Sequence, residues 1–396
     1  MQTEHNRQGD GASVLTDREG CPLIIEGKEN PAFSLSTAGA KGVPFVPSPA
    51  EADAAAARPA AARVDKVSSG HVTAGAKTAA LRVAAAGLEE PLPRFLDTLT
   101  KLDTGNGSCV ALGYFDGVHL GHRLVLARAV QEARARGCAA AVFTFAPPAN
   151  GSVKGKAILT PAEKLRRMAS LGIEAVLCPP FEAFCALSPE EFVETVLIEC
   201  LGAKAVFCGE NFTFGRGRAG NADTLRSLCA ARGIAVETLP LMECGGAPVS
   251  SSRIRALLAG GGIPAANALL GEAYCIDLPV RHGKRLGRTL GFPTINQVYP
   301  EGMLLPRQGV YVTRVLLNGQ WLPGATGLGT RPSVAGGGTG AGVTCETFIP
   351  DFAGELYDSA VRVRFCKFLW PTQKYDSLEA LTAMVNRAAD AARAWE

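Results

Sequence analysis

The sequence has no long hydrophobic run and almost no excess of either charge. Charged side chains are spread through the first twenty residues, so no apolar signal core fits there, and no run of eighteen apolar residues occurs anywhere. The formal net charge of the 396 residues is only +3, which argues against nucleic acid or a membrane surface as the main partner. We therefore expect a cytoplasmic protein, a monomer or weak homo-oligomer, whose partners are small molecules.

The twelve cysteines form no Cys-x-x-Cys pair. They fall singly, and several, such as Cys208 and Cys366, lie within apolar segments. We interpret them as small buried hydrophobic residues of a protein in a reducing compartment, rather than as a disulfide framework.

The most informative segment present is LGYFDGVHLGH, residues 112–122, which places His119 and His122 three residues apart in a glycine-rich turn. The apolar residues 109–112 predict a buried strand, and residues 123–136 repeat apolar residues at helical spacing. Backbone amides and the helix dipole at such a turn favour an anion. Two imidazoles on one side could stabilise charge developing on an α-phosphate. The alternatives are a plain helix cap, or metal ligation for which no third ligand lies nearby.

This segment resembles the Gly-x-Phe-Asp-Gly-Val-His-x-Gly-His signature of the bacterial bifunctional riboflavin kinase/FMN adenylyltransferase family, also called FAD synthetase. That family is part of the wider HxGH nucleotidyltransferases. The resemblance implies that FMN attacks the α-phosphorus of ATP here, giving FAD and pyrophosphate, with His119 and His122 stabilising the transition state. It also assigns nucleotide binding to Gly113, Phe115, Asp116, Gly117 and Gly121.

A second segment is similar to the family's flavin-side loop. Residues 205–209 predict a strand that leads into ENFTFGRGRAG, residues 210–220. The phenylalanines of this loop could face an isoalloxazine ring, and Arg216 and Arg218 could hold phosphate. A plain surface turn with buried aromatic residues is the alternative. The flavin-binding residues expected here are Asn211, Phe212, Phe214 and Gly215.

Residues 249–255, VSSSRIR, place three hydroxyls and two guanidinium groups at a predicted helix start. Such a cluster can receive a triphosphate through side-chain donors, backbone amides and fixed positive charge. A simple capping box is the competing explanation, but it needs one serine and no arginine. The segment is close to the family's Ser-Ser-Thr-x-Ile-Arg pattern. Nucleotide binding is expected at Ser250, Ser251, Ser252, Arg253 and Arg255, with the two arginines as candidates for the β- and γ-phosphates.

From about residue 273 onward, short alternating segments replace the rhythm of strands and helices. Residues 310–317, 343–349 and 361–368 predict strands, the last with a clear alternation of apolar and polar side chains. A small antiparallel barrel is the natural interpretation. An amphipathic helix over roughly residues 377–395 can cover one side of it.

Residues 282–296, HGKRLGRTLGFPTIN, resemble the riboflavin kinase signature. Their glycines and basic residues can wrap a polyphosphate, whereas no GxxxxGK[ST] motif occurs in the chain. Thr294 and Asn296, one strand period apart, can direct two oxygens toward Mg²⁺ bound to nucleotide phosphates. A basic loop that contacts nucleic acid is the alternative. Nucleotide binding is expected at Gly283, Lys284, Gly287, Arg288, Gly291 and Pro293, and metal binding at Thr294 and Asn296.

Glu346 aligns with the family's catalytic glutamate after the Gly-x-Arg-Pro motif, here residues 329–332. Phosphoryl transfer to an alcohol gains from a carboxylate that orients the hydroxyl and accepts its proton, so Glu346 is the candidate kinase base. A solvent-facing strand glutamate is the alternative.

The chain departs from the family pattern at several positions. An acidic residue and a histidine near the nucleotide site are replaced, an asparagine before the Gly-x-Arg-Pro motif is Gly327, and a histidine beyond the kinase base is Phe348. An arginine and a glutamate that the family keeps beside the flavin are also replaced. These changes sustain the alternative of a flavin-binding or regulatory relative that has lost one or both activities. A third option is another HxGH transferase that makes a CDP- or pantetheine-type product, but the riboflavin kinase motif argues against it. The departures are Ala146, Pro148, Gly327, Phe348, Trp370 and Thr372.

The expected fold is α/β plus β. A Rossmann-like HxGH nucleotidyltransferase domain takes residues 96–258, a linker follows over 259–272, and a riboflavin kinase barrel with its C-terminal helix occupies 273–396. Residues 1–95 form an alanine-rich leader whose composition can bury little core, so we expect it to be disordered. The resemblance implies riboflavin, FMN and ATP as substrates, FAD as product and Mg²⁺ as cofactor.

Overall fold

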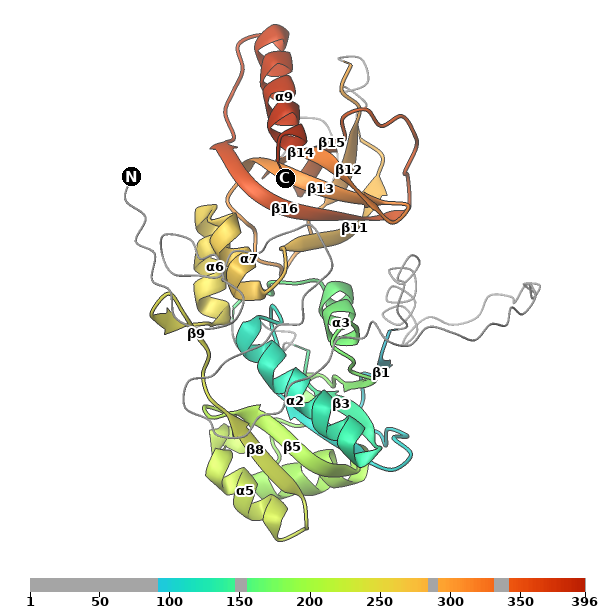
Figure 1. The fold of residues 1–396 in the computed structure, drawn as a ribbon, viewed down its shortest axis with the longest axis vertical. Helices are drawn as coiled ribbons and strands as arrows, with labels where there is room; N and C mark the ends of the chain where they lie inside the picture. The colour runs from blue at the N-terminus through green and yellow to red at the C-terminus, as the bar shows by residue number, and fades with distance from the viewer. Residues whose placement is uncertain (1–91, 147–154, 284–290, 331–341, 396) are drawn as a thin grey trace, which may run out of the picture.

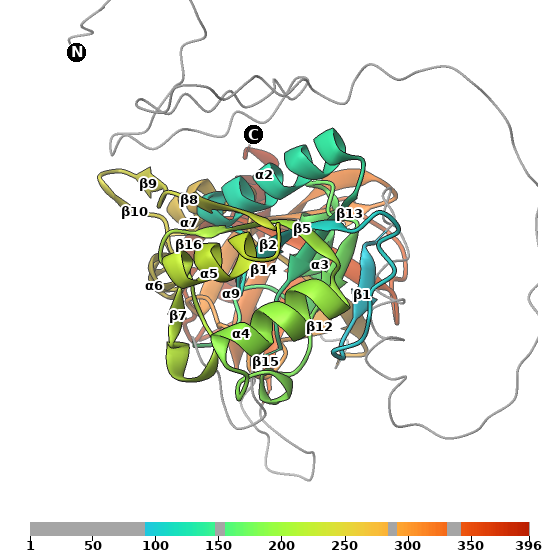
Figure 2. The same cartoon turned by 90° about the horizontal axis from the view of Figure 1, so that it is seen from below.

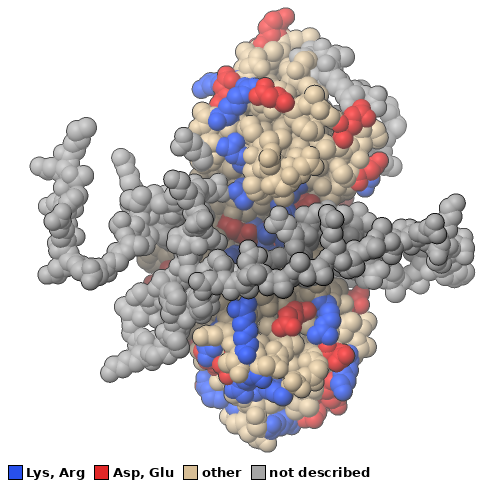
Figure 3. Space-filling view, turned by 45° about the vertical axis from the view of Figure 1, so that its right-hand side comes forward, with Lys and Arg blue, Asp and Glu red and all other residues tan. Residues whose placement is uncertain are grey.

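The structure is a computed structural model that describes residues 92–146, 155–283, 291–330 and 342–395. A parallel sheet with its helices lies at one end of the molecule, and a closed barrel with one helix lies at the other (Figure 1). On the face seen in Figure 3, basic and acidic side chains are interspersed. The predictions for leader residues 1–91 lie outside the described residues, as do those for Pro148, Lys284, Gly287 and Arg288.

The sheet of the first domain has six parallel strands in the order β1-β4-β3-β2-β5-β8. Every residue of β2 and β3 is buried, as expected for central parallel strands with helices on both faces. The sheet already begins at Arg94, inside the segment that we expected to be leader. The strands are β1 (Arg94–Leu96), β2 (Ser108–Leu112), β3 (Ala139–Phe143), β4 (Ala175–Leu177), β5 (Ala203–Gly209) and β8 (Ala235–Leu239).

Helices cover both faces of this sheet. Figure 2 shows α2 on one side and α4 and α5 on the other. Alternate residues of β2 accordingly belong to two separate clusters, with Cys109 packed on the α2 side and Val110 on the other. The helices are α2 (Leu120–Arg136), α3 (Pro161–Ala169), α4 (Pro189–Phe192) with the π-helix η2 (Val193–Cys200), α5 (Ala222–Ala230), α6 (Ser251–Gly260) and α7 (Ile263–Leu270).

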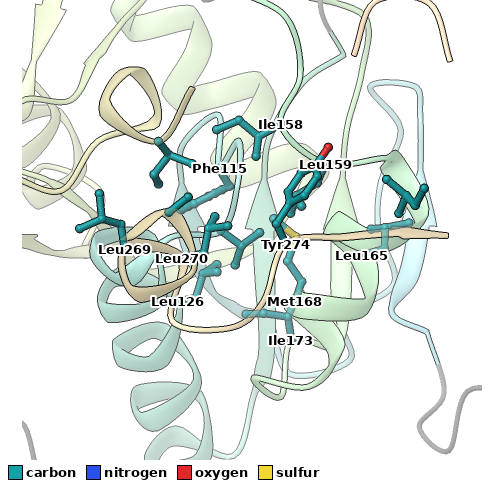
Figure 4. Close-up of a cluster of buried hydrophobic side chains, with 14 of the residues drawn as sticks. Phe115, Leu126, Ile158, Leu159, Leu165, Met168, Ile173, Leu269, Leu270 and Tyr274 are labelled. Atoms are coloured by element: carbon teal, nitrogen blue, oxygen red, sulfur yellow. The ribbon is translucent and has the colours of Figure 1, made fainter. Parts of the chain in front are cut away.

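The segment expected to be a linker, residues 259–272, contains α7. This helix buries Ile263, Leu269 and Leu270. Figure 4 shows Leu269 and Leu270 in one cluster with Phe115 of the first domain and Tyr274, which leads into the barrel. Apolar packing therefore runs continuously from the sheet domain to the barrel, so the two parts share one core.

The barrel closes in the order β11-β12-β15-β14-β13-β16, with every pairing antiparallel, and confirms the predicted architecture. Helix α9 (Leu378–Arg393) packs against β13 and β14 (Figure 1). The strands are β11 (Cys275–Arg281), β12 (Thr294–Val298), β13 (Gly309–Leu317), β14 (Gln320–Thr330), β15 (Val343–Phe348) and β16 (Ala360–Pro371).

Three threonine hydroxyls form a chain inside the barrel. Thr326 Oγ1 lies 2.8 Å from Thr313 Oγ1 and 2.8 Å from Thr347 Oγ1, and all three residues are fully buried. Each hydroxyl can both donate and accept, so the chain satisfies these polar groups in an apolar interior. Because side chains alternate along a strand, the neighbours of Thr326 and Thr347 point to the outer face of the barrel.

Within the described part of the chain, ten cysteines carry free thiols, and seven of these are buried. Cys244 is disulfide-bonded, so the interpretation of the cysteines as isolated thiols is wrong for that residue. Among the described residues, no helix is long and apolar enough to cross a membrane.

Candidate active sites

The loop between β2 and α2 carries the paired imidazoles. The rings of His119 and His122 stack with their centroids 3.6 Å apart and 16° between their planes. His119 caps α2, and its Nδ1 accepts a hydrogen bond from the backbone N–H of His122 at 3.4 Å. Burial lowers the pKa of His119 to about 4, so this ring is neutral at pH 7. With Nδ1 as acceptor, its proton lies on Nε2, which can donate to a phosphate oxygen.

The backbone of this loop is strained. Phe115 and Val118 have φ angles of 52° and 45°, in the left-handed region that side chains other than glycine seldom adopt. Such conformations cost about 1–3 kcal/mol each and persist where the surroundings over-determine them. Both side chains are buried in the core. Gly117 has a φ of +87°, and a Cβ there would lie 3.2 Å from Ile158, so this position requires glycine.

Asp116 ties the loop to two neighbouring segments. Its Oδ1 accepts from the N–H of Ile158 at 2.9 Å, and its Oδ2 pairs with Arg255 of α6. Its backbone carbonyl accepts from the Ser251 hydroxyl at 2.9 Å. The imidazole loop and the N-terminus of α6 are therefore joined through one buried residue.

A cavity of about 970 Å³ opens beside the imidazole loop. It brings together residues from three segments that are far apart in the sequence: the loop, the flavin-side segment and the start of α6. Among the described residues that line it, the predicted ones are Gly113, Phe115, Asp116, His119, Gly121, His122, Asn211, Phe212, Phe214, Gly215, Arg218, Ser250, Ser251, Ser252 and Arg255, whereas Arg216 does not line it.

Two of the nucleotide-binding residues that we predicted in the imidazole loop and the serine segment do not line the cavity. Gly117 is turned into the core beside Ile158. Arg253 directs its Nη1 to the carbonyls of Cys244 and Ala247, at 2.7 and 3.1 Å. These carbonyls belong to the hairpin of β9 (Glu243–Cys244) and β10 (Ala247–Pro248). In this structure Arg253 therefore holds the hairpin and is not among the residues that line the cavity.

An aromatic wall of the cavity was missed in the sequence. Phe145, Phe181 and Phe184 contact one another with ring centroids 5.5–5.6 Å apart, and Tyr114 lies 4.8 Å from Phe145. Phe143 and Phe192 continue the wall. The phenylalanines come from the end of β3, the turn after β4 and helix α4, whereas Tyr114 belongs to the imidazole loop, and no local pattern joins these segments. The three-residue spacing of Phe181 and Phe184 was the single local signal.

On the barrel, Asn296 of β12 pairs directly with Glu346 of β15. Residues opposite each other in a ladder share a face, and the inward position of Thr347 puts Glu346 on the outer face. Thr294 shares that face, and the Asn296 amide donates to its carbonyl at 3.3 Å. The predicted base and both predicted metal residues are therefore neighbours on one outer surface.

The backbone before β12 closes on this surface. A Cβ on Gly283 would lie 2.7 Å from Nδ2 of Asn296, so a larger residue at position 283 would displace the Asn296 amide. Gly291 and Pro293 directly precede β12 and are exposed. Among the described residues, no group of three His, Cys, Asp or Glu side chains could hold a metal ion. The groups that could bind a metal ion here are the neutral side-chain oxygens of Thr294 and Asn296 and the carboxylate of Glu346. Such a set suits a hard cation whose remaining ligands are phosphate oxygens.

Two departures from the family lie in the same ladder. Gly327 pairs with Glu346, and a Cβ on Gly327 would meet only the Glu346 carbonyl, at 3.9 Å. Phe348 pairs with Thr294.

The other described departures lie outside this ladder segment. The Trp370 ring stacks with the Arg387 guanidinium at 5.2 Å, and Thr372 lies beside Gly329. Ala146 forms a bridge to Pro180.

Comparison with known proteins matches both halves. The FAD synthetase family model covers residues 102–253, and the riboflavin kinase model covers residues 270–396. The bifunctional riboflavin kinase/FMN adenylyltransferase of Pseudomonas fluorescens is 37% identical over 297 residues, 72% of this chain and 92% of its own length. Its namesake from Escherichia coli K12 is 36% identical over 287 residues, 71% of this chain and 90% of its own length. The chain belongs to the bifunctional riboflavin kinase/FMN adenylyltransferase family.

A solved structure of the same fold is described as a macrolide-efflux protein from Streptococcus pneumoniae. It is 28% identical, has a TM-score of 0.68 and covers 77% of this chain and all of its own. Within the family, the sheet domain is the FAD synthetase part and the barrel is the riboflavin kinase part. Helix α7 lies between them and packs into the shared core.

Proposed function

We propose that this chain makes FAD from riboflavin in two ATP-dependent steps, each at its own site. The family and its catalysis are established by the two matching models and by the similarity to bifunctional relatives. The assignment of the two steps to two sites rests on two separate clusters of side chains. One is the imidazole pair over a large cavity, and the other is the Asn296 and Glu346 pair on the barrel.

In the cavity, an FMN phosphate oxygen attacks the α-phosphorus of ATP, and the bond to the leaving pyrophosphate breaks. Nε2–H of neutral His119 donates to the charge developing on the α-phosphate, with His122 stacked beside it. The hydroxyls and amides at the start of α6 hold the pyrophosphate. The aromatic wall offers ring faces to the isoalloxazine. Attack is direct, so no covalent enzyme intermediate is needed.

On the barrel, Glu346 orients the ribityl hydroxyl of riboflavin and accepts its proton as the γ-phosphoryl group of ATP is transferred. The products are FMN and ADP. The oxygens of Thr294 and Asn296 fit Mg²⁺ held with the ATP phosphates. The ion would supply charge neutralisation on those phosphates. Riboflavin, FMN and ATP are the partners in this proposal.

The test is to incubate the purified chain with riboflavin, ATP and Mg²⁺ and to separate the flavins by chromatography. A second reaction starts from FMN. Formation of FAD in both reactions supports both sites. Accumulation of FMN without FAD would remove the adenylyl step from the proposal. Absence of any new flavin would favour the binding or regulatory relative instead.

A further inference from the structure

Helix α3 presents two basic side chains to the imidazole loop, about one helical turn apart. Lys164 Nζ donates to the carbonyl of Tyr114 at 2.6 Å and to the Thr144 hydroxyl at 2.8 Å. Arg167 Nη1 donates to the carbonyl of Gly117 at 3.4 Å. The two carbonyls flank Phe115, the first of the strained residues of the loop. One helix therefore holds the loop on both sides of Phe115 and directly before Val118, the second strained residue.

Arg167 is held from several directions at once. Its side chain is fully buried, as is that of its ion-pair partner Glu163, 2.9 Å away on the same helix. Its Nη2 donates to the carbonyl of Ala273, the residue two positions before β11, at 2.7 Å. A desolvated guanidinium is stable only where its donors are satisfied, so these partners fix its position. Figure 4 shows Leu165 and Met168, from the same helix, near Tyr274, so α3 as a whole packs at the junction with the barrel.

Arg166 provides an internal comparison. It also pairs with Glu163, at 2.8 Å, and with Glu272, at 2.7 Å. The Arg166 guanidinium donates to the carboxylates of Glu163 and Glu272, neither of which belongs to the imidazole loop. Two adjacent arginines therefore share the same ionic network, and Arg167 adds bonds to the loop and to the Ala273 carbonyl.

We infer that Lys164 and Arg167 are positioning residues for the adenylyl step, an inference that rests on the proposed function. They act through the loop backbone. Because a trans peptide directs its C=O and N–H in opposite directions, the bond from Lys164 to the Tyr114 carbonyl directs the Phe115 N–H away from α3. The bond from Arg167 fixes the Gly117 carbonyl two residues before His119. The imidazole pair is thereby held in one orientation toward the reacting phosphate.

A purely structural role makes a different prediction. If these residues only stabilised the fold, their loss would lower both activities in proportion to the unfolded fraction. A positioning role lowers kcat of FAD formation, leaves KM for FMN and ATP unchanged, and spares FMN formation on the barrel, because the lost interaction serves only the transition state.

The experiment compares Arg167→Gln with Arg166→Gln in the full chain. FMN formation from riboflavin, FAD formation from FMN, and the thermal midpoint are measured for each variant. We expect Arg167→Gln to lower kcat of FAD formation roughly 10- to 100-fold below that of Arg166→Gln, at equal kinase rates. Equal FAD rates in the two variants, or a proportional loss of both activities in Arg167→Gln alone, would overturn the inference.

Lys164 gives a second test that leaves the buried ion pairs intact and covers the case in which Arg167→Gln does not fold. Lys164→Met is expected to lower kcat of FAD formation, and Lys164→Arg, which keeps an N–H donor, to restore most of it. A wild-type rate in Lys164→Met, or no gain from arginine, would overturn the inference. A wild-type chain that makes FMN but no FAD would instead remove the adenylyl step itself, and the inference with it.

Discussion

Asn296 and Glu346 lie directly opposite each other on the antiparallel strands β12 and β15. This register brings a neutral oxygen donor beside a carboxylate on the outer face of the barrel, whose inner face is closed by the threonine chain. A one-residue slip of either strand would turn one of the two side chains into the core. The barrel core therefore fixes the geometry that the proposed kinase site needs.

Replacing the proposed kinase base should separate the two activities. We expect Glu346→Gln to lower FMN formation about 10²- to 10⁴-fold, because the amide cannot accept the proton of the ribityl hydroxyl. FAD formation from supplied FMN should stay at the wild-type level. Chromatographic assay of each step checks this, and an unchanged FMN rate would show that another group is the base.

Replacing an imidazole should have the opposite effect. We expect His122→Ala to lower FAD formation about 10²- to 10³-fold, the usual cost of removing one group that stabilises developing charge. FMN formation in the same preparation serves as the control for folding. A loss confined to KM for FMN, with kcat unchanged, would contradict a role for His122 in the transition state.

Much of the fold and much of the candidate site could be predicted because the signals are local. The run of apolar residues in β2, the helix that ends at Gly137 and the alternation in β16 each occupy one stretch of chain. The loop, flavin-side and serine segments also carry their chemistry in adjacent residues. In the structure the loop and the flavin-side segment follow the parallel strands β2 and β5, whose carboxyl ends lie at one edge of the sheet, and the serine segment reaches the same cavity through the hairpin of β9 and β10.

What escaped prediction depends on contacts between distant residues. Arg253 sits in a phosphate-binding pattern, but the hairpin carbonyls of Cys244 and Ala247 take its guanidinium. The spacing of Arg167 along α3 does not reveal that it reaches Gly117 and Ala273 at once. The phenylalanine wall is likewise assembled from three segments. Local sequence patterns indicate which chemical groups are present, and tertiary packing determines which of those side chains face the ligand.

His119 should make stability depend on pH. Its ordinary pKa is 6.5, and burial lowers the pKa to about 4 in the folded chain. Between these values the unfolded chain binds the proton and the folded chain does not, so the free energy of unfolding falls as pH falls from 6.5 to 4. The loss is at most about 3 kcal/mol.

Urea unfolding of the wild type and of His119→Asn between pH 4 and 7 measures this contribution, because asparagine preserves the helix cap without titrating. The difference in unfolding free energy between the two proteins should change in favour of the variant as the pH is lowered. A difference that stays constant over this range would mean that His119 titrates normally in the folded chain.

Gly327 offers a test of one departure from the family. It lies opposite Glu346, and its outer side is open, since a Cβ there would meet only a carbonyl oxygen at 3.9 Å. Glycine inside a strand costs about 0.5–1 kcal/mol relative to alanine, so both Gly327→Ala and Gly327→Asn should raise the thermal midpoint. Only the asparagine adds an amide next to the proposed base, so we expect it alone to raise kcat of FMN formation. An equal rise in kcat in both variants would mean that the more stable strand, and not the amide, causes the rise. A lower kcat in the asparagine variant would mean that the open space beside Glu346 serves the reaction in this chain.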